Sequence, residues 1–258
     1  MRGTKSGDHL RRRGLAVNQS GFLERHLLDT ECLTNYNIVM RKIEFAVGES
    51  YHIYNRGVRK KILFIDERDY TRFLFLLIYF QSPILFFNLG RYVTNFVKHS
   101  VFNIPAKTIT KIIAKRLVKL HAFALMPNHF HLILEAAAEK GVSTYLHRVL
   151  NAYGKYFNTK YKESGHVFQG PFRAVPIGDN NQLLHTSAYV HRNCRELNGW
   201  RNQEHRYPWS SHQDYVSQNR WNELLSTDLI LGQFKNQKEY RDFVDSSPAK
   251  TVDDPNFC

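Results

Sequence analysis

The sequence has few cysteines, no long apolar run and a shortage of acidic residues. Its three cysteines, Cys32, Cys194 and Cys258, are odd in number and lie far apart. Neither a disulfide framework nor a zinc module built on cysteine pairs is therefore expected, and a reducing cytoplasm fits. The most apolar stretch, residues 73–87, contains polar residues and a proline, and it is shorter than the roughly 20 residues that a membrane-spanning helix needs. We expect a cytoplasmic protein without a membrane span.

What the sequence has instead is positive charge on a chain that can build a core. The 258 residues include 36 Lys and Arg against 23 Asp and Glu, which gives a formal net charge of +13. Hydrophobic residues make up 43% and aromatic residues 14% of the chain, a composition that excludes wholesale disorder. A basic surplus on a folded chain favours polyanionic partners, of which nucleic acid is the commonest.

The sequence divides into three parts. Residues 1–39 are polar and aperiodic and contain an arginine triplet, so we predict a disordered basic extension there. The pattern of a folded domain begins at Met40 and continues to residue 209. Within this domain, residues 84–117 are a mixed apolar and basic insertion that we expect to be helical. Residues 210–258 are predicted to form a helical C-terminal tail.

The central domain alternates between strands and helices. Short β-prone runs predict strands at residues 51–57, twice within residues 121–135, and at residues 165–177. Apolar residues at helical spacing predict helices between Asp66 and Pro83 and at residues 142–161 and 181–194. The resulting order is strand, helix, strand, strand, helix, strand, helix. It is typical of a ferredoxin-like α+β fold, an antiparallel sheet with helices on one face.

Two histidines on a predicted strand form the first candidate site. His129 and His131 are two residues apart and follow a turn at Pro127 and Asn128. Because side chains alternate along a strand, both imidazoles are expected on one face, close enough to share one metal ion. The alternative, two ordinary surface histidines, stays open on spacing alone.

A tyrosine and an asparagine on the last predicted helix form the second candidate site. Tyr189 and Asn193 are four residues apart, which places the phenol and the amide on one helix face. An amide oxygen can complete a two-histidine site for a divalent ion, and a phenol beside that ion can attack a phosphate. The alternative is an ordinary helix surface with a half-buried tyrosine.

Four segments resemble, in the same order, the motifs of a known family. Residues 121–134 closely resemble the signature of single-tyrosine transposases of the insertion-sequence-200 type, in which a hydrophobic residue separates two histidines. Further blocks of that family resemble residues 51–57, 165–173 and 189–193. Within that family the sequence resembles the branch of REP-associated tyrosine transposases, and the resemblance extends from Met40 to Trp209. Four ordered motifs are far more specific than any one of them.

This resemblance implies a fold, a metal site and a reaction. The fold is the HUH palm, a ferredoxin-like sheet that carries both histidines. His129, His131 and Asn193 would bind a catalytic Mg²⁺ or Mn²⁺ ion, and Tyr189 would be the nucleophile. The implied enzyme is a DNA transposase that cuts and rejoins single-stranded or hairpin DNA through a phosphotyrosine intermediate. Cys194 replaces the proline that usually follows the asparagine, so the end of the helix is less clearly marked.

The candidate DNA contacts are basic and aromatic residues. Cations that follow the phosphates and rings that stack on unpaired bases are typical of single-strand binding. The candidates are Arg56, Arg148, Lys155, Tyr156, Lys160 and Arg173. The expected partners are single-stranded or hairpin DNA and, in a homodimer, a second copy of the chain. The expected location is the nucleoid, away from membranes.

Two other functions are compatible with these residues. A metal-dependent nuclease would use the same site with water in place of Tyr189 as the nucleophile. A non-catalytic DNA-binding module would need only the basic surplus and the rings. The combination of His129, His131, Tyr189 and Asn193 argues against this second alternative.

Overall fold

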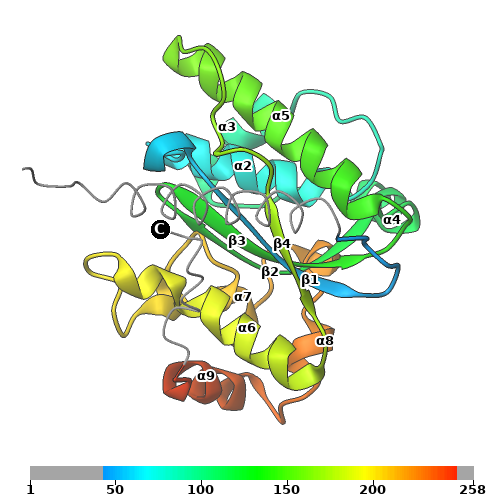
Figure 1. The fold of residues 1–258 in the computed structure, drawn as a ribbon, viewed down its shortest axis with the longest axis vertical. Coiled ribbons are helices and arrows are strands. Elements are labelled where there is room, and N and C mark those ends of the chain that lie inside the picture. Colours follow the sequence, from blue (N-terminus) through cyan, green and yellow to red (C-terminus); the bar gives the residue numbers. More distant parts are fainter. Residues whose placement is uncertain (1–42, 249–258) are drawn as a thin grey trace, which may run out of the picture. The chain divides into compact units, whose positions relative to one another are not determined.

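A four-stranded antiparallel sheet is the centre of the structure, a computed structural model that describes residues 43–248 (Figure 1). The strands are β1 (Ser50–Arg56), β2 (Val118–Met126), β3 (His129–Ala136) and β4 (Arg173–Ile177). They lie in the order β2-β3-β1-β4, and every neighbouring pair is antiparallel. This arrangement confirms the predicted α+β fold with a ferredoxin-like sheet. The predicted basic extension, residues 1–39, lies outside the described residues.

Two long helices cover one face of the sheet, α2 (Glu67–Tyr79) and α5 (Gly141–Tyr161). Helix α2 begins where predicted because the side chain of Asp66 accepts a hydrogen bond from the backbone N–H of Asp69, and the side chain of Asp69 accepts one from the backbone N–H of Asp66. This reciprocal capping satisfies backbone donors that the first turn leaves unpaired. The apolar residues of α2 and the inner face of α5 are buried against the strands.

The carboxylate of Asp69 also fastens α2 to α5. It is fully buried and accepts hydrogen bonds from Tyr156 Oη at 2.9 Å, Lys160 Nζ at 2.6 Å and Tyr161 Oη at 2.6 Å. Burial alone would raise the pKa of Asp69, but these hydrogen bonds and one from the backbone N–H of Ile65 lower it below its ordinary value. A charged carboxylate is therefore held between the two helices.

The insertion between α2 and β2 is helical, as predicted for residues 84–117. It contains α3 (Leu89–His99) and α4 (Ala106–Ala114). Helix α3 packs against α2, where the rings of Phe75 and Phe96 meet at 5.5 Å.

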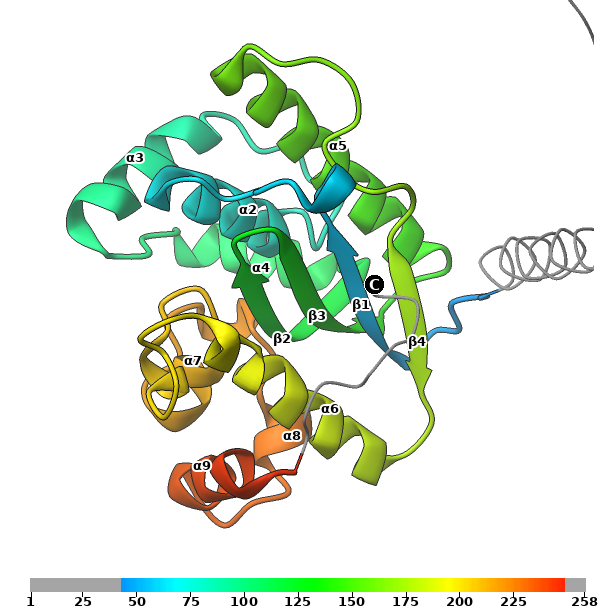
Figure 2. The same ribbon diagram turned by 60° about the vertical axis from the view of Figure 1, so that its left-hand side comes forward.

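The other face of the sheet is covered by α6 (Asn180–Arg192) and by the chain that follows it (Figure 2). That chain includes three further helices, which are α7 (His212–Val216), α8 (Asp228–Leu231) and α9 (Gln237–Ser246). The sequence analysis placed helices on one face only. The structure adds this second layer, so the histidine-bearing face of the sheet is buried as well.

The chain from Trp209 onward lies along the outer edge of β2. Its backbone pairs with β2 through Leu125 N–H to Trp209 O at 2.9 Å and Ser211 N–H to Phe123 O at 2.9 Å. A covered edge cannot pair with another chain. The division at residue 209 stays a prediction about sequence organisation, but the segment beyond it packs on the same sheet.

Among residues 43–248, none of the helices combines the length and apolar character required to span a membrane.

Candidate functional site

The two histidines share one face of the sheet, as the alternation predicts. His131 lies opposite Tyr54, and His129 lies opposite Arg56, in the register of β3 with β1. The intervening Phe130 points to the opposite face, where its ring meets Phe73 of α2 at 5.0 Å. The histidine face is therefore the one that α6 covers.

The side chain of His129 lies between two asparagines. Its Nε2 atom is 3.0 Å from Oδ1 of Asn193, which begins a 3₁₀ turn directly after α6. Its Nδ1 atom is 2.7 Å from Oδ1 of Asn128, in the turn that precedes β3. If Nδ1 donates its proton to Asn128, the lone pair on Nε2 faces Asn193, which is how outer hydrogen bonds orient a metal-binding imidazole.

His131 is held by a third histidine, His52 of β1. The distance from His52 Nε2 to His131 Nδ1 is 3.0 Å, and the two buried rings stack with centroids 5.2 Å apart. His52 was not among the predicted site residues. Alternation along β1 places His52 on the same face as Tyr54, but only the pairing of β1 with β3 shows that His131 shares this face.

Tyr189 of α6 lies over these two imidazoles. Its half-buried ring meets the ring of His131 edge-on at 5.3 Å and that of His52 at 5.7 Å. The structure thus brings together all four residues that the sequence analysis selected for the catalytic and metal roles. The roles themselves stay predictions.

Burial keeps both strand histidines neutral. It lowers the pKa of His129 to about 4, with the charge of Arg56 adding to the effect and the hydrogen bond to Asn193 opposing it. Burial also lowers the pKa of His131 well below its ordinary value, and the neighbouring His52 and His129 act in the same direction. Neutral imidazole is the form that ligates metal ions.

The separation of two of the proposed ligand atoms fits a divalent ion. Two ligand atoms that each lie about 2.1 Å from one ion, at a right angle, are about 3 Å apart. The 3.0 Å between His129 Nε2 and Asn193 Oδ1 matches that separation. Within residues 43–248, no three His, Cys, Asp or Glu side chains converge as a metal site. The amide oxygen of Asn193 would therefore be the third protein ligand beside His129 and His131.

The predicted DNA contacts fall on two sides of the sheet. Arg56 and Arg173 belong to the histidine face, because they pair in register with His129 and Tyr54. Nε of Arg56 donates a hydrogen bond to Oε1 of Gln169 at 2.6 Å. The other four candidates lie on α5, across the sheet, and the structure does not bring them near Tyr189. Their contact with DNA stays a prediction.

Three of the four α5 candidates have partners inside the protein. Arg148 donates to the backbone carbonyl of Ser82 at 2.5 Å, and Lys160 forms ion pairs with Asp66 and Asp69. The hydroxyl of Tyr156 donates to Asp69, as described above. Lys155 is exposed on the same helix. Several rings that could have stacked on bases are instead fully buried in the core, namely Tyr145, Tyr153 and Phe157.

Comparison with known protein families gives a match to part of the chain. Residues 88–193 match the family model described as "Transposase IS200 like". This segment is less than half of the chain, but it contains His129, His131, Tyr189 and Asn193, and it confirms the resemblance seen in the sequence. A search of curated proteins gives no match.

A solved structure is also similar to this chain. It is described as "Structure of the REP associates tyrosine transposase bound to a REP hairpin". The two chains are 12% identical, the alignment covers 73% of this chain and 91% of the other, and the TM-score is 0.48.

Proposed function

From the match of residues 88–193 to the IS200-like transposases, we propose that this protein is a metal-dependent DNA transposase. It cuts and rejoins single-stranded or hairpin DNA through a covalent link between phosphate and Tyr189. One observation carries the proposal: Tyr189, His129, His131 and Asn193, which come from a strand, a helix and a 3₁₀ turn, meet on one face of the sheet. Acting on DNA, the protein works at the nucleoid as a monomer or a homodimer.

His129, His131 and Asn193 hold the divalent ion in this proposal, which is Mg²⁺ or Mn²⁺ as the family resemblance implies. When bound, such an ion supplies Lewis acidity to a non-bridging oxygen of the scissile phosphate. The outer hydrogen bonds of Asn128 and His52 fix the ring orientations of His129 and His131. Site geometry is then set before DNA binds.

Tyr189 supplies the nucleophile. Its phenolic oxygen forms a bond to phosphorus, while the bond from phosphorus to the leaving sugar oxygen breaks and that oxygen takes a proton. A phenol with an ordinary pKa near 10 is mostly protonated at neutral pH, so the phenolic proton must leave during the attack. The phosphotyrosine conserves the energy of the broken diester bond, and a free sugar hydroxyl can then displace Tyr189 to rejoin a strand.

The decisive experiment is an adduct assay with the full chain. A labelled DNA hairpin with a single-stranded flank is incubated with Mn²⁺, and protein-linked DNA is measured on a denaturing gel. We expect wild type to form the adduct and Tyr189→Phe to form none and to cleave nothing. Tyr161→Phe is the matched control, because it removes a hydroxyl on the far side of the sheet.

Two outcomes would contradict the proposal. Cleavage by Tyr189→Phe without an adduct would identify a nuclease that uses water. Binding without cleavage in the wild type, with or without Mn²⁺, would identify a non-catalytic DNA-binding module. Melting curves of both variants show that each is folded when assayed.

A further inference from the structure

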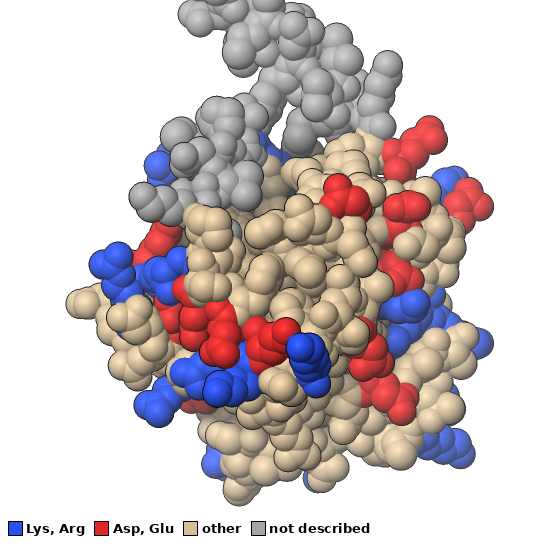
Figure 3. Space-filling model, turned by 90° about the horizontal axis from the view of Figure 1, so that it is seen from below, with Lys and Arg blue, Asp and Glu red and all other residues tan. Residues whose placement is uncertain are grey.

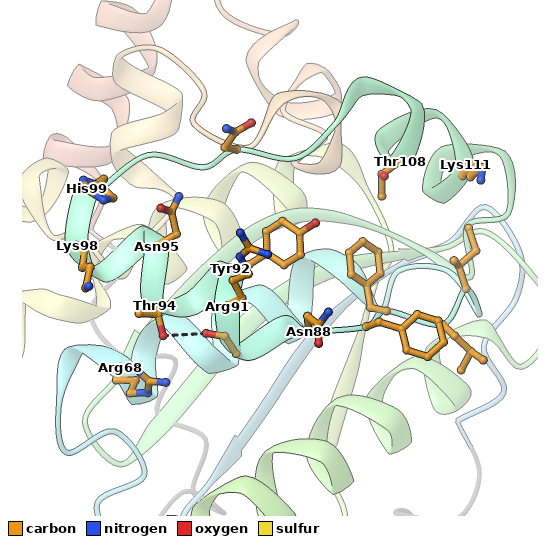
Figure 4. Close-up of a pocket in the computed structure, with 16 residues that line it drawn as sticks. Arg68, Asn88, Arg91, Tyr92, Thr94, Asn95, Lys98, His99, Thr108 and Lys111 are labelled. Atoms are coloured by element: carbon orange, nitrogen blue, oxygen red, sulfur yellow. Dashed lines mark hydrogen bonds between the residues drawn. The ribbon is translucent and has the colours of Figure 1, made fainter.

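A groove of about 1110 Å³ runs along the insertion helices (Figure 4). Helix α3 packs against α2, so the groove lies on the α2 side of the sheet and not on the side of α6, which carries Tyr189. Its walls come from α3, the start of α4, the segment before α3, and Arg68 of α2. The proposed reaction does not use this groove.

The groove is strongly basic. Residues 84–117 contain six Lys and Arg and no Asp or Glu, so 34 residues carry +6 of the net +13 of the whole chain. Four exposed cations line the groove, which are Arg68, Arg91, Lys98 and Lys111. Within residues 43–248, the ion pairs all involve other basic side chains. No carboxylate of the described residues therefore forms an ion pair with the four groove cations.

These cations are spread along the groove. Figure 4 shows Arg68 and Lys98 toward one end, Arg91 near the middle and Lys111 on α4 at the other end. An extended chain of phosphates could follow such a series, whereas a single small anion would need the cations to converge on one point.

The groove also presents apolar side chains to solvent. Phe87 is 76% exposed and Leu85 is 75% exposed, although large apolar side chains are usually buried. Both line the groove beside the half-buried ring of Tyr92. An exposed aromatic ring next to unpaired cations is typical of single-strand binding, because unpaired bases can stack on the ring while phosphates meet the charges.

At least one other face of the protein lacks such a concentration of basic side chains. On the face that carries α8 and α9, basic and acidic side chains are interspersed (Figure 3). The groove is also held in place by packing, since Phe96 of α3 meets Trp221 with ring centroids 5.8 Å apart. A preformed basic groove favours binding because less side-chain entropy is lost.

We propose that the groove between α3 and α4 binds the single-stranded flank of the DNA substrate. This inference rests on the proposed function for the identity of the DNA. Because the groove and Tyr189 lie on opposite sides of the sheet, the strand in the groove is not the segment being cut. Lys98 and Lys111 contact its phosphates and Phe87 stacks on one of its bases, so the groove anchors the DNA while Tyr189 acts elsewhere on it.

The test measures affinity for an oligothymidylate single strand over a range of salt concentrations, by fluorescence anisotropy. For single strands the logarithm of the binding constant falls by about 0.7 per neutralised phosphate for each unit of log salt. We expect Lys98→Gln/Lys111→Gln to reduce the slope by about 1.4 units. The matched control is Lys235→Gln/Lys238→Gln, two exposed cations at and before the start of α9, which should leave the slope unchanged.

A second variant tests the stacking contact. Phe87→Ala should weaken binding about 5-fold or more, as loss of one stacked base predicts, and leave the salt slope unchanged. Because Phe87 is largely exposed, its loss should not affect folding, and a melting curve checks this. Leu229→Ala, which removes an exposed apolar side chain on α8, is the control.

The outcomes separate this inference from the proposed function. If the groove variants bind the single strand more weakly but form as much adduct as wild type on a short hairpin without a flank, the groove binds the flank as proposed. Unchanged affinity and slope in both groove variants would overturn it, as would an equal loss for a matched duplex. If wild type forms no adduct but its single-strand affinity still depends on Lys98 and Lys111, the proposed function fails and the binding groove stands.

Discussion

The side chain of His52 fixes the ring orientation of His131. It has no proposed contact with DNA or metal, yet its Nε2 atom lies 3.0 Å from His131 Nδ1. Because His52 occupies Nδ1 of His131, the Nε2 atom of His131 is the one that can ligate an ion. Outer partners of this kind typically change metal affinity about 10- to 100-fold when they are removed.

We therefore predict that His52→Ala shifts the Mn²⁺ concentration needed for half-maximal adduct formation upward by about 10- to 100-fold. Saturating Mn²⁺ should restore most of the adduct, because Tyr189 and the ligands remain. His52→Gln should recover part of the affinity, since its amide can still hydrogen-bond to His131. His147→Ala, which changes an exposed histidine of α5, is the control. An unchanged Mn²⁺ requirement in His52→Ala would contradict this positioning role.

At the scale of elements, the buried carboxylate of Asp69 joins α2 to α5. Its removal leaves the hydroxyls of Tyr156 and Tyr161 without this acceptor, and it leaves the ammonium group of Lys160 with Asp66 as its remaining carboxylate partner. Breaking a buried charged pair by removing one partner commonly costs about 3–5 kcal/mol, and Lys160 is partly exposed, so solvent screening reduces its share.

We predict that Asp69→Ala lowers the free energy of unfolding by about 3 kcal/mol. Urea denaturation followed by circular dichroism gives this value. Asp242→Ala, on an exposed position of α9, should change the free energy by less than about 0.5 kcal/mol. Equal effects of the two substitutions would show that Asp69 does not join the helices.

At the scale of the whole molecule, buried neutral histidines make stability depend on pH. His212 is fully buried, and both of its ring nitrogens are without a hydrogen-bond partner in the described residues. Burial lowers its pKa to about 3, the nearby His205 and Arg241 act in the same direction, and Glu204 opposes them. The unfolded chain takes up a proton on this residue near pH 6.5, whereas the folded chain does so only near pH 3.

The contribution of His212 is therefore complete above about pH 6.5 and is lost as the pH falls toward 3, because the unfolded state binds more protons in this window. We predict a loss of up to about 1.4 kcal/mol per pH unit from this one group. Urea denaturation between pH 7.5 and 4.5 should show a smaller dependence on pH for His212→Leu than for wild type. His147→Gln should keep the wild-type dependence, and the same dependence in His212→Leu would contradict the prediction.

The sequence by itself determined the elements and the faces of the strands. Alternation in β3 placed His129 and His131 on one side, Asp66 marked the start of α2, and Pro127 with Asn128 marked the turn between β2 and β3. These features depend on neighbours within a few residues, so they can be predicted from local periodicity and capping. The four motifs also identified the residues that meet at the site, because they occur in the same order as in the family that the sequence resembles.

Only the tertiary structure decided which of those residues meet and which charges are paired with each other. It paired His52 with His131 through the register of β1 with β3, and it placed Lys160 against Asp66 and Asp69, about 90 residues away in the sequence. It also gathered around one groove cations of α3 and α4 that form no ion pair within residues 43–248. A basic residue has the same appearance in a sequence whether or not a carboxylate lies opposite it, because that pairing depends on packing between distant segments.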